Sequence, residues 1–497
     1  MNPRSWALAI VRLCLFDGVV AAALAAALVL VAEDELPVPA AAAFTLADLT
    51  GTGRTELIAA GNAGVFVLTP AGDASEPAEW AVVASLPPLP APATAVAAAD
   101  FIGDGVPSIA VGTAQAGAVY LLRWTGFDWT VVAQTGYLWA PVAALAAADF
   151  SGQGAAQLAA VDAGGGVTVF AWQDRTLAPV RRWQAAGGRA PLTAVARFAA
   201  DPRPRLVLVD AEGGVGVWSW PMPEPEAQAF VWGTPTALAV ADVEGRGPEV
   251  IVVTDERLLY RFVWTDGRLV QAAQPLHDAR LPFDFMAPIR RPGQSADLLL
   301  AHGANGIGVW RVTSSSVSLV DEGWSNPPLA AALWPGSDTI VLAERTGERG
   351  GPLRVWSRRP AGYFNLTVDG RPVPLGDPPV FYQGQVMLSA RDWAAALGLQ
   401  LFWNAADLRL TVAGRRSYAM LTVGERQVLL PGGPRAVSLA PELREGRTYV
   451  PPEFPTWFGA TYQWDPRRRA LHVYTDAAPR SEAAGNEPPG TEENGGT

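Results

Sequence analysis

The chain has 497 residues, of which 49% are hydrophobic and 17% charged, and its net charge is −11. All 37 basic residues are arginines, which excludes Schiff-base catalysis, a Walker-type phosphate lysine and a Ser-x-x-Lys nucleophile. A disulfide framework, a zinc cluster or an iron–sulfur site cannot be built within one chain from one cysteine and three histidines, namely Cys14, His277, His302 and His472. The acidic balance argues against a nucleic-acid partner, because phosphate binding needs clustered positive charge.

Residues 1–32 have the pattern of a signal peptide or an N-terminal anchor. Two arginines precede an apolar run at 18–32, and the acidic stretch 33–35 follows it. The run is about 15 residues long, shorter than the roughly 20 residues of a bilayer span, which favours a cleaved signal over an anchor. Cleavage after Ala32 or within 40–43 fits the pattern, and a buried core helix is the structural alternative. We expect contact with a membrane only through this segment, if it stays uncleaved.

A repeated phrase fills residues 44–360, after a linker at 33–43. Each unit predicts an Ala/Val-rich strand, a Gly-rich turn, an apolar strand and then an alternating strand. Seven units of roughly 41 to 52 residues indicate a seven-bladed β-propeller, so the chain is expected to be mainly β. The copies begin at these residues: Phe44, Ala95, Ala143, Thr193, Ala237, Phe285 and Leu329.

Tryptophan recurs at the end of the alternating strand in six of these units. A residue that returns at the same place in nearly every blade is expected to pack blade against blade. The recurrent residues are Trp124, Trp172, Trp220, Trp264, Trp310 and Trp356. Tryptophans outside this register are the better candidates for contact with a ligand, and these are Trp129, Trp139, Trp232, Trp324 and Trp334.

The phrase at 97–112, AAADFIGDGVPSIAVG, resembles the FG-GAP or VCBS repeat of integrin-α-like propellers. The resemblance implies calcium held by carboxylates at alternate positions of a glycine-containing turn. The loops depart from that pattern, because Ile102 and Arg246 stand where oxygen ligands are expected. We therefore expect no cofactor, and calcium is the alternative that the loops leave open. The candidate metal ligands are Asp48, Glu56, Asp100, Asp104, Asp242, Glu244 and Glu249.

A different, duplicated phrase fills residues 361–476 and predicts a small α+β domain. Gly398 and Gly459 recur at the same interval as Trp403 and Trp464. The sequence predicts a helix at 391–397 that ends at Gly398, and a short or irregular counterpart because of three prolines. The hairpin pattern predicts strands at 408–412 and 470–474.

This second phrase resembles the N-terminal domain of copper amine oxidases, a stalk-like module. The matching residues include the turn 368–370, the Leu-Gly pair at 397–398, and 446–451. Oxidase activity is not expected, because catalysis belongs to a separate domain with three histidine ligands and an Asn-Tyr sequence that this chain lacks. Residues 477–497 are acidic and rich in Gly, Pro and Glu, which predicts a disordered tail.

No Gly-x-Ser-x-Gly or His-Glu-x-x-His motif is present, so no catalytic residue is proposed from the sequence. The sequence favours an extracellular or cell-envelope, non-catalytic scaffold that recognises a protein or a cell-wall glycan through one propeller face. Two alternatives stay open at this point. One is a glycan-active hydrolase or lyase with a carboxylate pair on that face. The other is a membrane-tethered sensor or assembly subunit.

Overall fold

The computed structural model describes residues 28–475, except 72–78, 116, 199–200, 223, 279, 305, 336, 347–349, 361–362, 383–384 and 416. The chain divides into two units, Met1–Ala361 and Gly362–Thr497. Within the described residues, no helix has the length and apolar character needed to cross a membrane.

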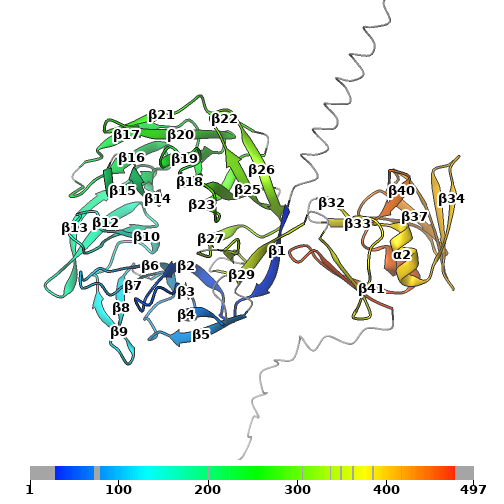
Figure 1. Cartoon of the computed structure of the whole chain (residues 1–497), viewed down its shortest axis with the longest axis horizontal. Helices are drawn as coiled ribbons and strands as arrows, with labels where there is room; N and C mark the ends of the chain where they lie inside the picture. The colour runs from blue at the N-terminus through cyan, green and yellow to red at the C-terminus, as the bar shows by residue number, and fades with distance from the viewer. Residues whose placement is uncertain are drawn as a thin grey trace, which may run out of the picture. The chain divides into compact units, whose positions relative to one another are not determined.

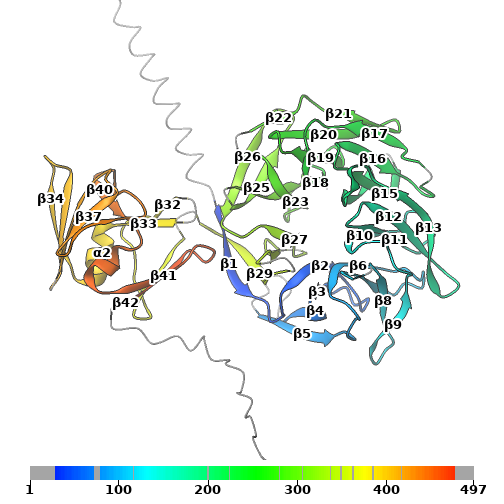
Figure 2. The same cartoon turned by 180° about the vertical axis from the view of Figure 1, so that it is seen from behind.

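Five antiparallel sheets follow one another along the first unit, and each takes its four main strands in chain order. They are arranged in a ring, with the first strand of each sheet toward the centre (Figures 1 and 2). A short strand, β22 (Leu276–His277), pairs with β20 at the edge of the fifth sheet. The main strands are β2 (Ala41–Ala47), β3 (Glu56–Gly61), β4 (Gly64–Ala71), β5 (Glu79–Ser85); β6 (Ala93–Ala99), β7 (Ser108–Thr113), β8 (Val119–Trp124), β9 (Trp129–Gln134); β10 (Val142–Ala148), β11 (Gln157–Asp162), β12 (Gly166–Gln173), β13 (Thr176–Gln184); β14 (Leu192–Phe198), β15 (Asp201–Val209), β16 (Gly214–Trp218), β17 (Ala227–Phe230); β18 (Pro235–Ala241), β19 (Glu249–Thr254), β20 (Leu258–Thr265) and β21 (Arg268–Gln271).

An eight-stranded sheet completes the ring, and it consists of two four-stranded halves. The N-terminal strand β1 (Leu28–Glu35) is the outermost strand of the second half, where it runs antiparallel to β29. On its other side β1 makes a short parallel contact with β26 of the first half. The chain's first described strand therefore completes a sheet built from the last strands of the unit. The other strands are β23 (Phe283–Ile289), β24 (Leu298–Gly303), β25 (Gly306–Val312), β26 (Val317–Gly323), β27 (Pro328–Leu333), β28 (Ile340–Glu344) and β29 (Leu353–Pro360).

The position of β1 differs from the boundaries predicted for the N-terminal segment. Residues 29–32 belong to the predicted targeting segment, yet their side chains are buried at 3% exposure or less. The acidic stretch that follows pairs with arginines of β29, since Glu33 contacts Arg359 at 2.7 Å and Glu35 contacts Arg354 at 2.9 Å. Cleavage after Ala32 would leave only the last three residues of this strand. The predicted targeting residues 1–27 lie outside the described residues.

The sheets of the ring are held together by apolar clusters, which combine residues of two neighbouring sheets or, in one case, of the two halves of the eight-stranded sheet. Second strands such as β7 and β19 are buried along their full length, which suits their Val/Ile/Ala content. One cluster joins Trp334 of the last sheet to Phe44 and Leu57 of the first, so the ring is closed by packing as well as by β1. Each fully buried Val, Leu or Ile contributes about 1.5–3 kcal/mol.

The recurrent tryptophans mostly pack between neighbouring sheets, as the sequence predicts. Trp310 and Trp356 are buried in such clusters, and Trp172, Trp220 and Trp264 pack against them while partly exposed. Trp124 departs from the pattern, because it is 39% exposed and contacts Trp129 at the edge of its own sheet.

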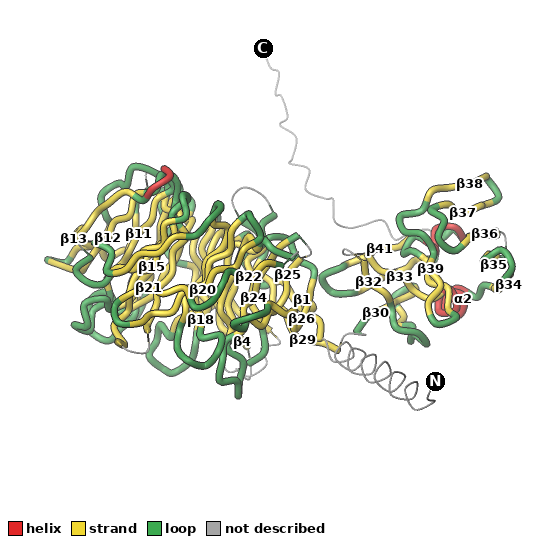
Figure 3. Tube along the Cα trace, turned by 90° about the horizontal axis from the view of Figure 1, so that it is seen from above, coloured by secondary structure: helices red, strands yellow, loops and turns green. Residues whose placement is uncertain are grey.

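The described residues of the second unit form a small α+β domain with one α-helix and short antiparallel sheets, apart from a parallel pairing of β30 with β42. Figure 3 shows α2 (Ala390–Leu397) in red among these strands. The strands are β30 (Asn365–Val368), β31 (Arg371–Pro372), β32 (Val380–Tyr382), β33 (Gln385–Ser389), β34 (Gln400–Asn404), β35 (Arg409–Ala413), β36 (Tyr418–Thr422), β37 (Gln427–Leu430), β38 (Gly433–Ala436), β39 (Glu442–Arg444), β40 (Arg447–Val450), β41 (Thr461–Asp465) and β42 (Ala470–Tyr474).

Local chemistry explains both helical segments of this domain. The Ser389 side chain caps α2 by accepting a hydrogen bond from the Asp392 backbone N–H, and Gly398 ends the helix in the left-handed region at φ 65°. The counterpart is the 3-10 helix η2 (Phe454–Phe458), which ends at Gly459 with φ 86°. The predicted helix, its glycine stop and its short counterpart are therefore confirmed. A single apolar core around Trp393, Phe454 and Leu471 supports the domain.

Candidate binding face

The topology of the ring sorts its loops onto two faces. In an antiparallel sheet taken in chain order, successive turns alternate between the two ends of the strands. The turns between first and second strands therefore lie on one face. The turns between second and third strands lie on the opposite face, together with the links to the next sheet. Hydrogen bonds confirm the second grouping, since the Thr234 N–H donates to Asp255 Oδ1 at 2.7 Å and the Val231 N–H donates to the Gly213 carbonyl at 3.0 Å.

We call the first of these the carboxylate face, because its turns hold the predicted metal ligands Asp48, Asp100, Asp104, Asp242 and Glu244, with Glu56 and Glu249 at the start of the adjoining strands. Asp48 and Asp100 mainly bind the backbone of their own turns. The Gly53 N–H donates to Asp48 Oδ2 at 2.7 Å, and the Gly103 and Gly105 N–H groups donate to Asp100 at 2.7 Å. Desolvation works to raise the pKa of Asp48, but the backbone donors, Gly53 first, hold it below its ordinary value.

The neighbouring candidates in these two turns also have partners within the fold. Glu56 accepts a hydrogen bond from the Leu49 N–H at 2.8 Å and one from the Thr50 hydroxyl at 3.3 Å. Asp104 forms an ion pair with Arg123, and this hydrogen bond lowers the pKa of the Asp104 carboxyl. These carboxylates therefore stabilise their turns and strand ends.

In the fifth sheet, a guanidinium group lies between two of the predicted ligands. Arg261 of β20 contacts both oxygens of Glu249 at 2.8 Å and reaches Glu244 at 3.3 Å. Both Arg261 and Glu249 are buried, and the hydrogen bond from Arg261 lowers the pKa of Glu244. Asp242 accepts from the Gly247 N–H at 3.1 Å and lies 3.5 Å from Arg290.

These donor sets do not fit a calcium ion, which takes six to eight oxygen ligands. In the part of the chain that the structure describes, no group of three or more His, Cys, Asp or Glu side chains is placed to hold a metal ion. The structure thus brings Glu244 and Glu249 together around Arg261, and it keeps the candidate ligands of different sheets in separate turns. The expectation about calcium itself stays a prediction.

The opposite face carries exposed aromatic side chains, and we call it the aromatic face. Tyr137 and Trp139 lie on the link between β9 and β10 and are 71% and 86% exposed. Phe230 and Trp232 lie at the link between β17 and β18 and are 53% and 73% exposed. The ring of Trp232 packs edge-on against Phe230 with centroids 5.6 Å apart.

Only some of the predicted ligand-contacting tryptophans reach solvent. Trp139 and Trp232 are among the most exposed large side chains of the described residues, whereas Trp129 and Trp334 are buried and Trp324 is partly buried. Burial of Trp129 and Trp334 follows from their places in clusters between neighbouring sheets. The prediction therefore identified two of the four residues that define this face.

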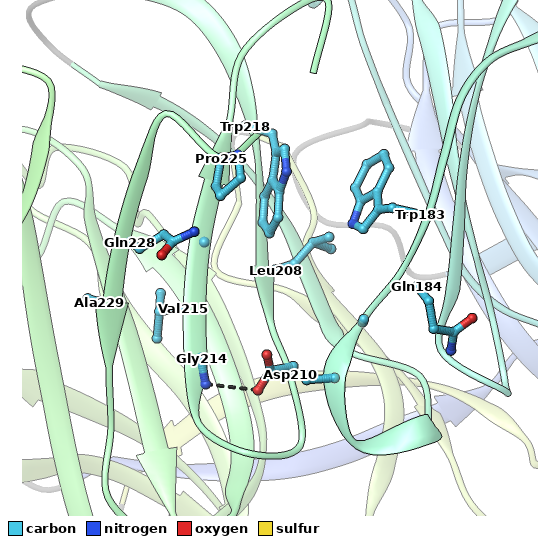
Figure 4. Close-up of a pocket in the computed structure, with 13 residues that line it drawn as sticks. Trp183, Gln184, Leu208, Asp210, Gly214, Val215, Trp218, Pro225, Gln228 and Ala229 are labelled. Carbon is cyan, nitrogen blue, oxygen red and sulfur yellow. Dashed lines mark hydrogen bonds between the residues drawn. The ribbon is translucent and has the colours of Figure 1, made fainter. Parts of the chain in front are cut away.

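A cleft of about 240 Å³ lies between β13 and the outer strands of the next sheet, and it adjoins the aromatic face. Trp183 and Trp218 form one wall, with their rings stacked at 5.7 Å and an interplanar angle of 24°. Figure 4 shows these two rings at one end of the cleft and Asp210, with Gly214, at the other. Gln184 and Gln228 are among the polar residues that line it.

Sequence reasoning did not single out Trp183 or Trp218, because neither lies at the recurrent tryptophan position. One local signal was present in the Gly-x-Trp pattern of Gly216 and Trp218. A Cβ atom at position 216 would lie 2.3 Å from the Trp218 ring, so the glycine makes room for the indole. Trp183 offers no comparable signal, since the next sheet brings Trp218 beside it only in the folded ring.

The fold and its loops define the first unit as a β-propeller-like ring, and the second unit is a small α+β domain. Residues 367–473 of that domain match the family model of the copper amine oxidase N-terminal domain, which confirms the predicted resemblance. No curated protein matches this chain.

Solved structures similar to the chain include two crystal structures of BBS1N in complex with ARL6DN, one soaked with lead and one with mercury. They have TM-scores of 0.46 and 0.45 and 15% sequence identity. Each match covers 66% of this chain and 96% of the other.

Proposed function

We propose that this chain is a non-catalytic binding or scaffold protein of the cell envelope or cell exterior, and that it recognises its ligand through the aromatic face. The observation that carries the proposal is the exposure of Tyr137, Trp139, Phe230 and Trp232 on one face of the ring. Large exposed aromatic side chains on one face of a domain are typical of interaction sites, because a solvent-exposed ring gains free energy when a partner covers it. The carboxylates of the other face already have partners within the fold.

We further infer that the ring has seven blades of the FG-GAP or VCBS type. Five four-stranded sheets and the two halves of the eight-stranded sheet support this count. The repeated Asp of the first turn supports the type, since Asp48, Asp100 and Asp149 all accept hydrogen bonds from the backbone of their turns. We propose that the second unit acts as a stalk-like module without oxidase activity.

The place of β1 supports a specific expectation about export. Processing after Ala32 would remove Leu30 and Val31, which are buried at 1% exposure. We therefore expect any cleavage to occur before Leu28, and an uncleaved segment would correspond to the membrane-tethered alternative. The intact mass of the exported protein tests this point. An N-terminus at Glu33 in a folded, stable protein would contradict it.

The proposed binding role is tested with envelope fractions of the source organism and the full chain. The double variant Trp139→Ser, Trp232→Ser removes the two most exposed indoles of the aromatic face, and we expect it to lose most of the captured material. The matched control is Phe127→Ser, since Phe127 is 94% exposed but lies in the turn between β8 and β9 on the carboxylate face. Equal capture by both variants would contradict the proposed role.

A further inference from the structure

We propose that the cleft between β13 and the next sheet binds one neutral sugar ring of a glycan. The inference rests on the proposed binding role and names its ligand class. The cleft, at about 240 Å³, is smaller than the roughly 300–1,000 Å³ of pockets for drug-sized ligands. It therefore suits a single ring-sized group of a longer chain.

The aromatic wall offers a surface for the apolar side of a pyranose. Trp183 and Trp218 are each partly exposed and their rings stack on each other, so a sugar would pack against the side of a ring that is turned away from its partner. The faces of aromatic rings carry partial negative charge, which attracts the C–H bonds on the flat side of a sugar. Gly216 makes room for the Trp218 indole, because any Cβ at that position would meet the ring.

Asp210 is held in place by backbone donors, and several polar groups of the cleft still have hydrogen-bonding capacity. Asp210 Oδ1 accepts from the Gly214 N–H at 2.8 Å and from the Glu212 N–H at 3.0 Å. Its Oδ2, the Gln228 amide and the two indole N–H groups make no hydrogen bond among the described residues. A cleft that offers both acceptors and donors matches hydroxyl groups, which both donate and accept.

Other ligand classes fit this set of groups less well. An anionic ligand would be repelled by the Asp210 carboxylate and by the chain's net charge of −11. A proline-rich peptide would use the aromatic wall but has few donors for Asp210 Oδ2, and an unpaired buried polar group costs about 1–3 kcal/mol. A neutral glycan satisfies both the aromatic wall and the polar groups.

The surroundings of the cleft extend the surface in both directions along the aromatic face. On one side the Arg182 guanidinium lies over the Trp139 ring at 5.7 Å, next to Trp183 in β13. On the other side a Cβ at Gly213 would lie 3.4 Å from the Phe230 ring, and Phe230 contacts Trp232. These residues on either side of the cleft can contact sugar rings that flank the one in the cleft.

Calorimetric titration of the full chain with three neutral hexasaccharides tests the proposal: cellohexaose, maltohexaose and chitohexaose. We expect at least one to bind with a Kd below about 1 mM, as appropriate for a few contacts. Tryptophan fluorescence should change with the same midpoint, because two indoles form the wall. Absence of heat and of fluorescence change with all three sugars, up to about 5 mM, would overturn the proposal.

Two variants locate the binding in the cleft without removing its packing. Asp210→Asn keeps an acceptor for the Gly214 N–H but replaces Oδ2 with a donor, and Gln228→Ala alters an exposed side chain. We expect Asp210→Asn to weaken binding by about tenfold, which corresponds to about 1.4 kcal/mol, and Gln228→Ala to weaken it less. Phe127→Ala should bind like the unchanged chain. Sugar binding that both cleft variants retain in full would overturn the assignment to this cleft.

Failure of this inference can be told apart from failure of the proposed function. If no hexasaccharide binds but the Trp139→Ser, Trp232→Ser variant still loses envelope capture, the binding role stands and the glycan assignment is wrong. A protein ligand would then be indicated if protease treatment of the envelope fraction abolished capture. If neither the sugars nor the face variants have an effect, both proposals are wrong.

Discussion

The two faces of the ring use their conspicuous side chains in opposite ways. On the carboxylate face, Asp48 and Asp100 accept hydrogen bonds from their own turns, and Glu249 is buried against Arg261. On the aromatic face, Trp139 and Trp232 are largely exposed to solvent. The residues that most resemble a metal site by their chemistry therefore stabilise the fold, while the exposed aromatic residues are free to contact a ligand.

The difference has a simple structural origin. A tight turn between two paired strands leaves several backbone N–H groups without strand partners, and a neighbouring Asp side chain is the nearest acceptor. A link between two sheets runs over the surface of the ring, where water can hydrogen-bond to its backbone groups. Fewer of its side chains are therefore needed as hydrogen-bond partners for the backbone. Carboxylates that accept hydrogen bonds from their own turns therefore have a structural role, and we propose that the exposed rings of the aromatic face contact the ligand.

We expect the largest effect from the removal of β1, because the ring that carries both faces depends on this strand. A chain that begins at Leu36 lacks β1 and leaves the edge of β29 without its partner. Losing buried residues such as Val29, Leu30 and Val31 should cost about 1.5–3 kcal/mol each, which is comparable with a whole domain's stability of about 5–15 kcal/mol. We expect poor soluble yield and loss of the cooperative thermal transition by circular dichroism. An unchanged transition would show that ring closure does not need β1.

The next effect tests the structural role of the carboxylate face. Arg261→Met leaves the buried Glu249 charge without its partner, and we expect a loss of about 3–5 kcal/mol in urea unfolding. Adding Glu249→Leu should recover much of this loss, because the uncompensated charge is removed. Arg246→Met is the matched control, since this exposed arginine contacts Glu244 only at 3.7 Å and should contribute less than about 1 kcal/mol. A loss of stability as small as that of Arg246→Met would contradict the structural role of the Arg261–Glu249 pair.

A smaller effect is expected on the aromatic face, where a substitution at Gly216 would crowd the Trp218 ring of the cleft. Gly216→Ala places a methyl group against the Trp218 ring, and we expect overpacking to cost about 1–3 kcal/mol and to disturb the cleft. Gly136→Ala on the same face is the control, because nothing lies within 4 Å of the added methyl group. Thermal melting and tryptophan fluorescence measure both variants. Equal changes in Tm and fluorescence for Gly216→Ala and Gly136→Ala would contradict the close packing of the Trp218 ring against Gly216.

The pH dependence of the carboxylate face should be modest. Arg123 lowers the pKa of Asp104 below its ordinary value of 3.8, so the folded state favours the charged form more than the unfolded state does. The resulting stability is present above pH 3.8 and is lost as the pH falls through the lowered pKa of the folded state. Asp104→Asn should therefore lower the Tm slightly at pH 7, and this difference should shrink as the pH falls below 3.8. A Tm difference that persists at low pH would assign the effect to something other than this charge.

The smallest expected effect concerns calcium. We expect millimolar calcium to leave the Tm of the full chain unchanged, because the turn carboxylates already bind backbone N–H groups or arginines. A ligand that binds only the folded state must raise the Tm, so the melting curve is a direct test. A calcium-dependent rise that Asp100→Asn removes would show that at least one turn binds the ion after all.

Much of the architecture could be predicted from periodicity in the sequence. The returning phrase predicted a mainly β ring, and the duplicated phrase predicted α2, its stop at Gly398 and the strand β42. The interval between copies can be read directly from the sequence, so its detection does not require knowledge of contacts between distant residues. The N-terminal strand could not be predicted in this way. Residues 28–32 are apolar, and an apolar run is expected both in a buried strand and in a targeting segment.

The sequence by itself determined which chemistries are excluded, where the repeats lie and which turns carry carboxylates. Only the tertiary structure decided how these groups are used. Arg261 follows Glu249 by twelve residues, and its guanidinium meets that carboxylate because β20 runs antiparallel beside β19, where Arg261 pairs with Ile251, two residues from Glu249. Trp183 and Trp218 come from different sheets and stack only when the ring closes. Contacts between distant residues depend on strand pairing and sheet packing, which no local pattern specifies.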